Sequence, residues 1–583
     1  MTHTTTLDPF TLEIVKDSLL ATGDEMFVAL ARTSMSPIIY EVLDYASGLT
    51  DAKGNLLTQG NGVTGFIGML TFMVKETLSK YPGDQLKEGD IIIINDPYQG
   101  GGSHLSDVGL VMPIFVDGEL IAFSANKAHW TEVGGKDPGS FTNDSVDIFQ
   151  EGIQFSCLKL YDEGKLNDVL IEIIRSNVRF PELSLGDMWA QVAALKTGNR
   201  RINELCKKHT TETILAAIEY LLDHGETLAR EELKKLPKGD FYAEDFIDTD
   251  GIGNGPFPIK VKVTITDDEF ICDFRGSSPQ VPGPMNCSKT GLTSAVRAIF
   301  LAITNPEQDV NDGVFRPLRI LTDKKSIMSA ERPVPVSNYF ETLLGSLDLV
   351  WKAMAPYLPE RLNAGHFLSV CAVTLSGKHQ DTEDSFLIVE PSVGGWGASN
   401  RNDGASGQFC MGDGETYNVP VEVAETRYGV MLDEYSLRED GNGSGAGEFV
   451  GGKGVTRSYR AMTDAQQVTV TYGRNKFFPW GISGGHDGSP NEFFVDKADG
   501  TIDGPFGVYP RYPLNTGDVV RLVTGTGGGY GNPLRRDAAQ VAKDVRNGYF
   551  TLEEARVVFG VEVDSETFDY KELATRKNEK EMN

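Results

Sequence analysis

Two histidines and one aspartate in one short stretch of this chain have the residue types of a metal site. His104, Asp107 and His129 lie close together in a chain of 583 residues that contains only eight histidines. Two neutral imidazoles and a carboxylate suit a divalent transition metal such as zinc, manganese or iron, and a catalytic site leaves one position open for water. Spacing alone does not separate this interpretation from ordinary polar loop residues, because His-x-x-Asp with a distant histidine is a weak pattern.

Three predicted strands position these side chains. Residues 91–94 are four isoleucines, a β-branched run without helical period that predicts a buried strand. A glycine-rich turn follows and leads to the first histidine and the aspartate. The next two strands, 108–115 and 120–124, are joined by Asp117-Gly118, a strong hairpin signal. Because His129 comes just after the second of these strands, we expect the three side chains to meet at one end of a sheet.

Three further acids are candidates for the same site. Glu41 and Asp44 follow a helix predicted over 8–32, which begins with a capping Asp and a proline. Asp44 could supply a second carboxylate to the metal and Glu41 could act as a base, although the residues alone favour solvated loop acids. Asp96 lies in a turn and could orient a metal-bound histidine.

Composition narrows the class of protein. The formal net charge of −29 disfavours nucleic-acid binding, which needs clustered Lys and Arg. No apolar run approaches the roughly 18 residues of a membrane span, and the N-terminus does not resemble a signal peptide. The six cysteines are scattered, without a Cys-x-x-Cys pair, so neither a disulfide framework nor a zinc ribbon is indicated. The cytoplasm is the expected compartment.

The pattern of segments predicts a multi-domain α+β protein. An N-terminal α/β region that carries the metal site is expected over 1–238 and includes a long helical segment over 187–235. A middle α+β domain over 239–380 begins with the alternating hairpin 259–274. A β-rich, glycine-rich region with short terminal helices is expected over 381–583.

Three glycine-rich motifs imitate functional sites. GEFVGGKG at 447–454 nearly matches a phosphate-binding P-loop, but it lacks the hydroxyl that holds magnesium and follows no buried strand. GISGG at 481–485 fits a nucleophile elbow only formally, because no strand precedes it and no helix follows it. GTGGGYG at 525–531 could form an anion nest, although a tight turn is favoured.

Ordered motifs along almost the whole chain resemble the hydantoinase B/oxoprolinase family. They include RTSMSPIIYEVLDYASGLTDAKGNL, NDPYQGGGSHLSDVGLVMPIF, KAHWTEVGG, IFQEGIQF, DFRGSSPQVPGPMN, NVPVEVAE and GTGGGYGNPLRRDAAQ. This family includes B subunits of ATP-dependent N-methylhydantoinases and caprolactamase, 5-oxoprolinase, and subunits of acetone and acetophenone carboxylases.

The resemblance implies a metal site formed by His104, Asp107 and His129, with Asp44 favoured over Glu41 as a further ligand. It implies zinc as the favoured metal, with manganese and iron open. It also implies a hydantoinase A-type partner that binds ATP, in a heterotetramer. The implied chemistry is that the partner phosphorylates a small cyclic amide, after which metal-bound hydroxide attacks the activated carbon and phosphate leaves with ring opening.

Departures from the family pattern bear on the reaction. Carboxylase relatives place an additional histidine at the position of Gly102, which favours cyclic amide hydrolysis here. Trp130 is expected to narrow the pocket and to make it more apolar, and the glycines at 100–102 are expected to keep the approach open. A carboxylase component remains the first alternative, and a non-catalytic scaffold for the ATP-binding partner is the second.

Overall fold

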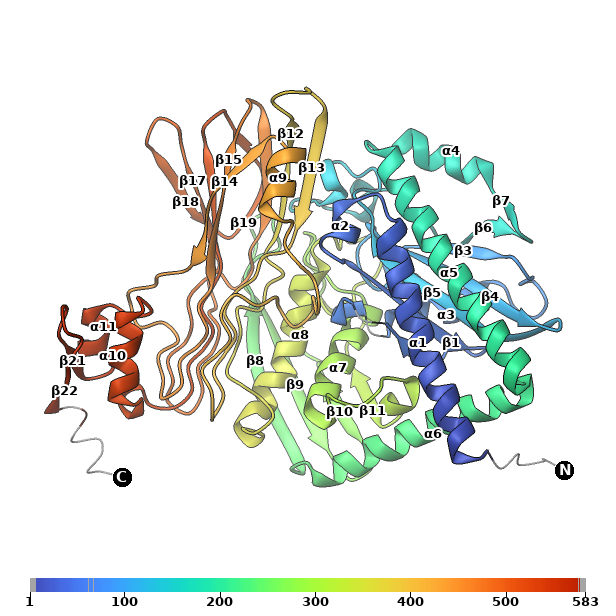
Figure 1. Cartoon of the computed structure of the whole chain (residues 1–583), viewed down its shortest axis with the longest axis horizontal. Helices are drawn as coiled ribbons and strands as arrows, with labels where there is room; N and C mark the ends of the chain where they lie inside the picture. The colour runs from blue at the N-terminus through green and yellow to red at the C-terminus, as the bar shows by residue number, and fades with distance from the viewer. Residues whose placement is uncertain (1–6, 61, 67, 575, 577–583) are drawn as a thin grey trace.

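A seven-stranded antiparallel sheet forms the N-terminal part of the computed structural model, which describes residues 7–60, 62–66, 68–574 and 576 (Figure 1). Its order is β2-β1-β5-β4-β3-β6-β7, so the β4–β5 hairpin lies near the centre. Asp117 and Gly118 in its turn both have positive φ, 50° and 83°, as a type I′ turn requires. The strands are β1 (Tyr45–Asp51), β2 (Leu56–Gln59), β3 (Ile91–Ile94), β4 (Asp107–Val116), β5 (Glu119–His129), β6 (Leu158–Asp162) and β7 (Lys165–Leu166).

Helices cover both faces of this sheet. α1 begins where predicted, because the Asp8 carboxylate accepts hydrogen bonds from the Phe10 and Thr11 amides. α1 and α5 pack on one face, and α3 packs its apolar side against β4 and β5 on the other. The long helix expected over 187–235 is two helices, because Thr210 interrupts it with a φ of 66°. The bounds are α1 (Pro9–Thr33), α2 (Pro37–Tyr40), α3 (Met69–Lys80), α4 (Asp168–Asn177), α5 (Pro181–His209) and α6 (Thr211–Lys235).

A four-stranded sheet of order β11-β10-β9-β8 follows in the middle of the chain. The predicted hairpin over 259–274 is confirmed as β9 and β10. Helix α8 packs on β8 and β9, and α7 packs beside α8. The bounds are β8 (Gly239–Ile247), β9 (Phe257–Ile265), β10 (Phe270–Asp273), β11 (Leu318–Leu321), α7 (Lys289–Thr304) and α8 (Tyr339–Met354).

The C-terminal third contains two further antiparallel sheets and a small terminal unit. The orders are β13-β12-β16-β19 and β14-β15-β20-β17-β18, and α10, α11 and the β21–β22 pair form the terminal unit at the edge of the molecule (Figure 1). The bounds are β12 (Ala372–Lys378), β13 (Ser385–Glu390), α9 (Val421–Arg427), β14 (Val430–Leu437), β15 (Val455–Ala461), β16 (Gln466–Thr471), β17 (Glu492–Asp496), β18 (Ile502–Phe506), β19 (Val508–Leu514), β20 (Val519–Val523), α10 (Ala538–Arg546), α11 (Leu552–Val557), β21 (Val561–Val563) and β22 (Tyr570–Glu572).

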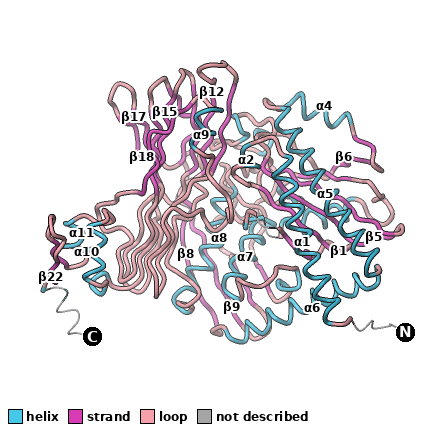
Figure 2. Tube along the Cα trace, viewed as in Figure 1, coloured by secondary structure: helices cyan, strands magenta, loops and turns pink. Residues whose placement is uncertain are grey.

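Long extended runs outside the sheets lie side by side below these strands and account for much of the loop content in Figure 2. Backbone hydrogen bonds join them, for example from Gly527 N to the Gly452 carbonyl at 3.0 Å. A Cβ on Gly452 would lie 2.0 Å from the Ala405 carbonyl oxygen, so glycine is required for this spacing. The segments 447–454, 481–485 and 525–531 all belong to this arrangement, and the Lys453 ammonium pairs with Asp440. Their glycines therefore serve backbone packing.

The predicted domain boundaries stay predictions. The first sheet lies within 1–238, and the second lies within 239–380. Strand β12 precedes the boundary predicted at 380, yet it pairs with β13 and β16 of the C-terminal region. Within the described part of the chain, none of the helices is both long enough and apolar enough to cross a membrane.

Candidate metal centre

The register of three neighbouring strands places three candidate ligands in one row. Asp107 at the start of β4 is paired directly with His129 at the end of β5. β1 pairs Tyr45 with Ala128, and the His129 amide donates to the Asp44 carbonyl at 3.0 Å. Residues directly opposite each other in an antiparallel sheet point to the same face. The carboxylates of Asp44 and Asp107 and the imidazole of His129 are therefore presented together at the end of the sheet, where Asp107 and His129 were predicted to meet.

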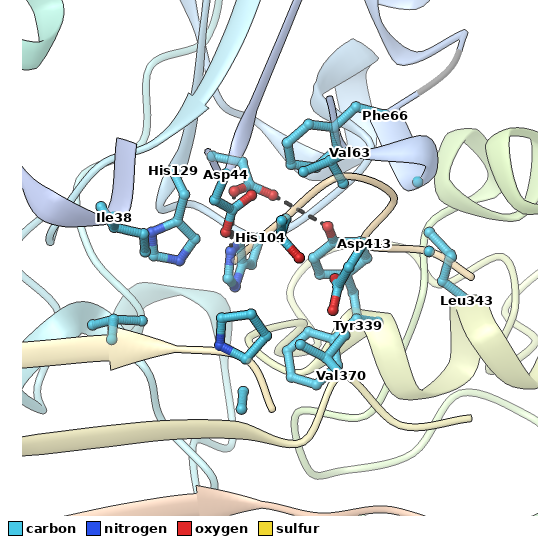
Figure 3. A pocket seen from close by; sticks show the side chains of 18 of the residues that line it. Ile38, Asp44, Val63, Phe66, His104, His129, Tyr339, Leu343, Val370 and Asp413 are labelled. Carbon is cyan, nitrogen blue, oxygen red and sulfur yellow. Dashed lines mark hydrogen bonds and ion pairs between the residues drawn. The ribbon is translucent and has the colours of Figure 1, made fainter. Parts of the chain in front are cut away.

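A tight turn adds His104 to this row. The Asp107 amide donates to the His104 carbonyl at 3.3 Å, so the two side chains leave the same turn. Atom Nε2 of His104 lies 3.3 Å from Oδ1 of Asp107, and the His104 and His129 ring centroids are 4.9 Å apart. All three residues are buried, and their ligand atoms lie within 4.8 Å of one another. Figure 3 shows both imidazoles beside Asp44 in the pocket.

The segment that enters α8 orients two of these candidate ligands, His104 and Asp107. The Ser337 carbonyl contacts Nδ1 of His104 at 2.8 Å, and the Tyr339 hydroxyl donates to Oδ2 of Asp107 at 3.2 Å. The Ser337 amide in turn donates to the buried carboxylate of Glu151 at 2.9 Å. A carbonyl oxygen only accepts, so Nδ1 of His104 carries hydrogen and Nε2 can offer its lone pair. This arrangement is the usual outer support of a metal-bound histidine and carboxylate.

Two buried carboxylates at the site, those of Asp44 and Asp107, lie near one buried ammonium, that of Lys127. Burial raises the pKa of Asp44 well above its usual range, and the nearby charges of Asp107 and Asp413 raise it further. Burial lowers the pKa of His129 to about 4, so its imidazole is neutral at pH 7. The ammonium of Lys127 is buried against the Asp107 carbonyl at 2.9 Å, and burial lowers its pKa to about 8. A divalent cation would allow both carboxylates to ionise.

Unpartnered atoms give an independent test of the fit to a metal. Neither ring nitrogen of His129 has a hydrogen-bond partner in the described structure, and Oδ1 of Asp107 has none beyond its approach to His104. When His104 is neutral with its hydrogen on Nδ1, its Nε2 and Oδ1 of Asp107 are two electron-pair donors that face each other at 3.3 Å. A cation between them removes this repulsion and also gives His129 a partner. The residues present therefore fit a divalent metal.

A small, mostly apolar cavity lies beside these ligands (Figure 3). The N-terminal sheet contributes the edge that carries the candidate ligands, the start of α8 contributes a second wall, and the C-terminal region closes the cavity. Asp44 also lines it. Its apolar lining consists of Ile38, Val63, Phe66, Phe141, Phe340, Leu343, Leu344, Val370 and Val389, with Ala372 and Pro391. This apolar lining suits a small apolar ring better than a charged polymer.

Two other acids predicted for the site, Asp96 and Glu41, do not line the cavity. Both carboxylate oxygens of Asp96 are engaged, with the Tyr98 amide at 3.0 Å and with Arg332 at 2.5 Å, so a role in orienting a histidine gains no support. Glu41 ends α2 and does not line the cavity, and its charge acts on Tyr40 and Tyr428. Its role as a base stays a prediction.

Two predictions about the pocket were wrong. Trp130 is fully buried away from the cavity, where its indole nitrogen donates to Gln191 at 2.8 Å. Successive strand residues point to opposite faces, and Trp130 directly follows His129. The glycines at 100–102 do not keep an approach open, because they are buried and a Cβ on Gly101 would lie 2.4 Å from the Asp96 carbonyl oxygen.

Two solved structures of known proteins share the fold of this chain. The solved ATP-dependent caprolactamase from Pseudomonas jessenii matches with a TM-score of 0.89 at 27% identity, over 96% of this chain and 97% of that one. The nucleotide-free acetone carboxylase structure, which concerns ATP-dependent acetone carboxylation, has the same fold. Its TM-score is 0.89 at 19% identity, over 99% of this chain and 82% of that one.

The sequence comparisons identify the family. The family model Hydantoinase B/oxoprolinase matches residues 8–533, and this chain therefore belongs to the hydantoinase B/oxoprolinase family. It is 32% identical to the putative D-/L-hydantoinase B subunit of Pseudomonas sp. strain NS671 over 97% of each chain. It is 30% identical to the beta subunit of caprolactamase from Pseudomonas jessenii over 96% of this chain and 97% of that one.

Proposed function

We propose that this chain is the B-type component of an ATP-dependent cyclic amide hydrolase and that it completes ring opening of a substrate activated by a partner. The observation that carries the proposal is the buried group of His104, Asp107 and His129 with unpartnered atoms beside an apolar cavity. The end-to-end similarity to proteins named as hydantoinase and caprolactamase subunits supports the same substrate class.

The metal would be held by His104, Asp107 and His129, with Asp44 as the fourth protein ligand. A divalent metal, with zinc favoured, would lower the pKa of a water molecule and polarise an oxygen of the substrate. Asp44 is suited to the fourth position because it shares the row of Asp107 and His129 and lines the cavity. Glu41 does not line it, which favours Asp44 over Glu41.

The remaining groups of the site hold the ligands and receive the substrate. Tyr339 fixes Asp107 through its hydroxyl, and the Ser337 carbonyl fixes the ring of His104. Lys127, two residues before His129 on β5, offsets part of the carboxylate charge. The apolar walls of Phe141 and Phe340 exclude water from the flanks of a ring, so that the attacking water comes only from the ligand side.

A partner protein is part of the proposal. The relatives are named as the B subunit of a hydantoinase and the beta subunit of caprolactamase, which implies partner subunits in those systems. We infer a hydantoinase A-type partner that binds ATP and phosphorylates the amide oxygen, in a cytoplasmic heterotetramer. The glycine-rich segment that imitates a P-loop is packed against neighbouring backbone, which supports ATP binding on the partner.

Co-expression with a hydantoinase A-type partner tests the reaction. The purified pair is assayed for ATP-dependent opening of lactams, hydantoins and 5-oxoproline, and in parallel for bicarbonate-dependent consumption of ketones. Ring opening supports the proposal, whereas ketone consumption alone contradicts it in favour of a carboxylase. Normal turnover of a pair that carries Asp107→Ala would instead show that this chain is a scaffold.

Metal analysis tests the site separately from activity. His104→Ala and His129→Ala are each expected to remove most of the bound metal, because each deletes a ligand. His224→Ala, which changes an exposed histidine on α6, is the matched control and is expected to retain the metal. Unchanged metal content in both ligand variants would contradict the assignment.

A further inference from the structure

A buried carboxyl group in the cavity has no part in the chemistry described so far. Asp413 lines the cavity, and only 8% of the residue is exposed. Its Oδ2 atom has no hydrogen-bond partner within the described ranges of the chain. In the view of Figure 3, Asp413 and His129 lie on opposite sides of the pocket. A buried carboxyl oxygen without a partner is costly, so its retention in a substrate cavity points to a partner on the substrate.

The backbone around Asp413 is held in place by the N-terminal part of the chain. The Gly65 amide donates to the Gly412 carbonyl at 2.7 Å, and the Tyr417 amide donates to the Val42 carbonyl at 3.0 Å. Gly414 has a φ of 61°, and a Cβ there would lie 2.5 Å from the Gly62 carbonyl oxygen. These contacts position the Asp413 carboxyl on rigid backbone, as a group that acts on substrate requires.

Apart from the Thr416 hydroxyl and the candidate metal ligands, the other polar side chains of the cavity are already engaged. Glu390 accepts hydrogen bonds from the Val419 amide and the Tyr459 hydroxyl and pairs with Arg457. The hydroxyl of Tyr339 donates to Asp107, and burial raises its pKa well above its usual range, so it is a poor acid. Asp413 is therefore the carboxyl among the described lining residues that is free to meet a substrate atom outside the metal group.

The chemistry of a phosphorylated cyclic amide requires such a group. Water adds to its activated carbon, and the carbon then carries a hydroxyl, a phosphate and the ring nitrogen. If phosphate leaves first, the closed amide forms again and ATP has been consumed without ring opening. If nitrogen leaves first, the ring opens. Phosphate is the better leaving group unless nitrogen receives a proton, so a proton donor at nitrogen decides the outcome.

We propose that Asp413 is a further catalytic residue, which gives its proton to the ring nitrogen and thereby couples phosphate consumption to ring opening; this inference rests on the proposed function. The carbon–nitrogen bond breaks, and its electron pair goes to nitrogen, which takes the Asp413 proton. The hydroxyl oxygen forms the carbonyl of an acyl phosphate, and the proton it loses returns to Asp413 through water. A second water then hydrolyses the acyl phosphate to carboxylate and phosphate.

The surroundings of Asp413 suit this role. Burial raises its pKa to about 7, although a hydrogen bond with the Cys410 thiol opposes the rise. A carboxyl group near this value carries a proton for part of the time at neutral pH and can release it to a more basic nitrogen.

The decisive experiment measures coupling in the reconstituted two-component enzyme. Asp413→Asn keeps the shape of the side chain and removes the acidic carboxyl proton, so the rate of ring opening is expected to fall at least about 100-fold. ATP consumption is expected to fall much less, so that ADP formed per ring opened rises. In ¹⁸O-water with ATP, recovered unopened amide is expected to gain ¹⁸O, because phosphate departs with the original amide oxygen.

Controls separate this role from a structural one. Asp413→Glu restores a carboxyl and is expected to recover part of the coupling. Asp187→Asn changes a buried carboxyl outside the cavity and is expected to leave the ADP-to-product ratio unchanged. Bound metal is expected to stay at the unmodified level in Asp413→Asn.

Each outcome is decisive. A normal ratio without ¹⁸O in the amide, in a folded Asp413→Asn enzyme, overturns the inference alone. Failure of Asp413→Glu to recover any coupling, when Asp413→Asn has lost it, also overturns the inference. If the unmodified pair opens no cyclic amide, the proposed function fails, and the inference fails with it.

Discussion

Removal of the Tyr339 hydroxyl is expected to weaken metal binding without altering any ligand. This hydroxyl donates to Oδ2 of Asp107 at 3.2 Å, in a fully buried setting. A hydrogen bond to a charged group contributes about 1.5–3 kcal/mol, and about 1.4 kcal/mol corresponds to a tenfold change in binding. Tyr339→Phe keeps the ring and opens no cavity, so we expect the zinc affinity to fall by roughly 10- to 100-fold, the usual effect of losing an outer hydrogen bond.

The assay is a competition titration of metal-free protein with zinc and a chromophoric chelator. Tyr472→Phe is the matched control, because it also removes a hydroxyl from a fully buried tyrosine, one that contacts Ser392 outside the cavity. Circular dichroism confirms that both variants are folded. If Tyr339→Phe binds zinc as tightly as the unmodified chain does, the hydroxyl does not support the ligand and the geometry has been misinterpreted.

Three further predictions concern stability and the cavity wall. Burial raises the pKa of Glu341 to about 8, so the folded state holds a proton that the unfolded state loses near pH 4.5. Stability therefore falls as the pH rises from about 4.5 to about 8. Glu341→Gln is expected to flatten the pH dependence of the thermal midpoint. An unchanged slope in that variant would contradict the assignment. Asp187→Ala leaves the amides of Met35 and Ser36 without their acceptor, and only Ser36 is buried, so the free energy of unfolding is expected to fall by about 1–3 kcal/mol in urea titrations, whereas an unchanged free energy of unfolding would contradict the argument. Gly414→Ala is expected to displace the wall that carries Asp413, so that ring opening falls while metal content, measured by atomic emission, stays unchanged; loss of the metal would show a wider distortion.

Local patterns predicted the elements that support the site, and the reasons are physical. The four isoleucines of β3 and the Asp117-Gly118 turn specify a buried strand and a hairpin with little help from the rest of the chain. The hairpin then fixes His129 opposite Asp107, so three ligands could be predicted to meet. The break at Thr210 was not predictable from the apolar pattern, which continues through both helices.

Local sequence patterns could not predict the contacts between distant segments. Tyr339 and Asp413 are far from the histidines in sequence, and neither stands in a motif of ligand spacing. Only the packing of α8 and of the segment around Gly412 against the N-terminal sheet brings them to the cavity. The error at Trp130 was different, because strand alternation from His129 already predicts that its side chain points away.

Residues near Asp413 close the cavity, and the ribosome makes them long after it makes the N-terminal sheet. Asp413 is made 284 positions after His129, since 413 minus 129 is 284. At roughly 5–20 residues per second, the ribosome needs about 15–60 s to produce the intervening chain. The hairpin that presents Asp107 and His129 thus emerges well before its cover exists, and during that interval the ligands are open to metal ions from the surroundings.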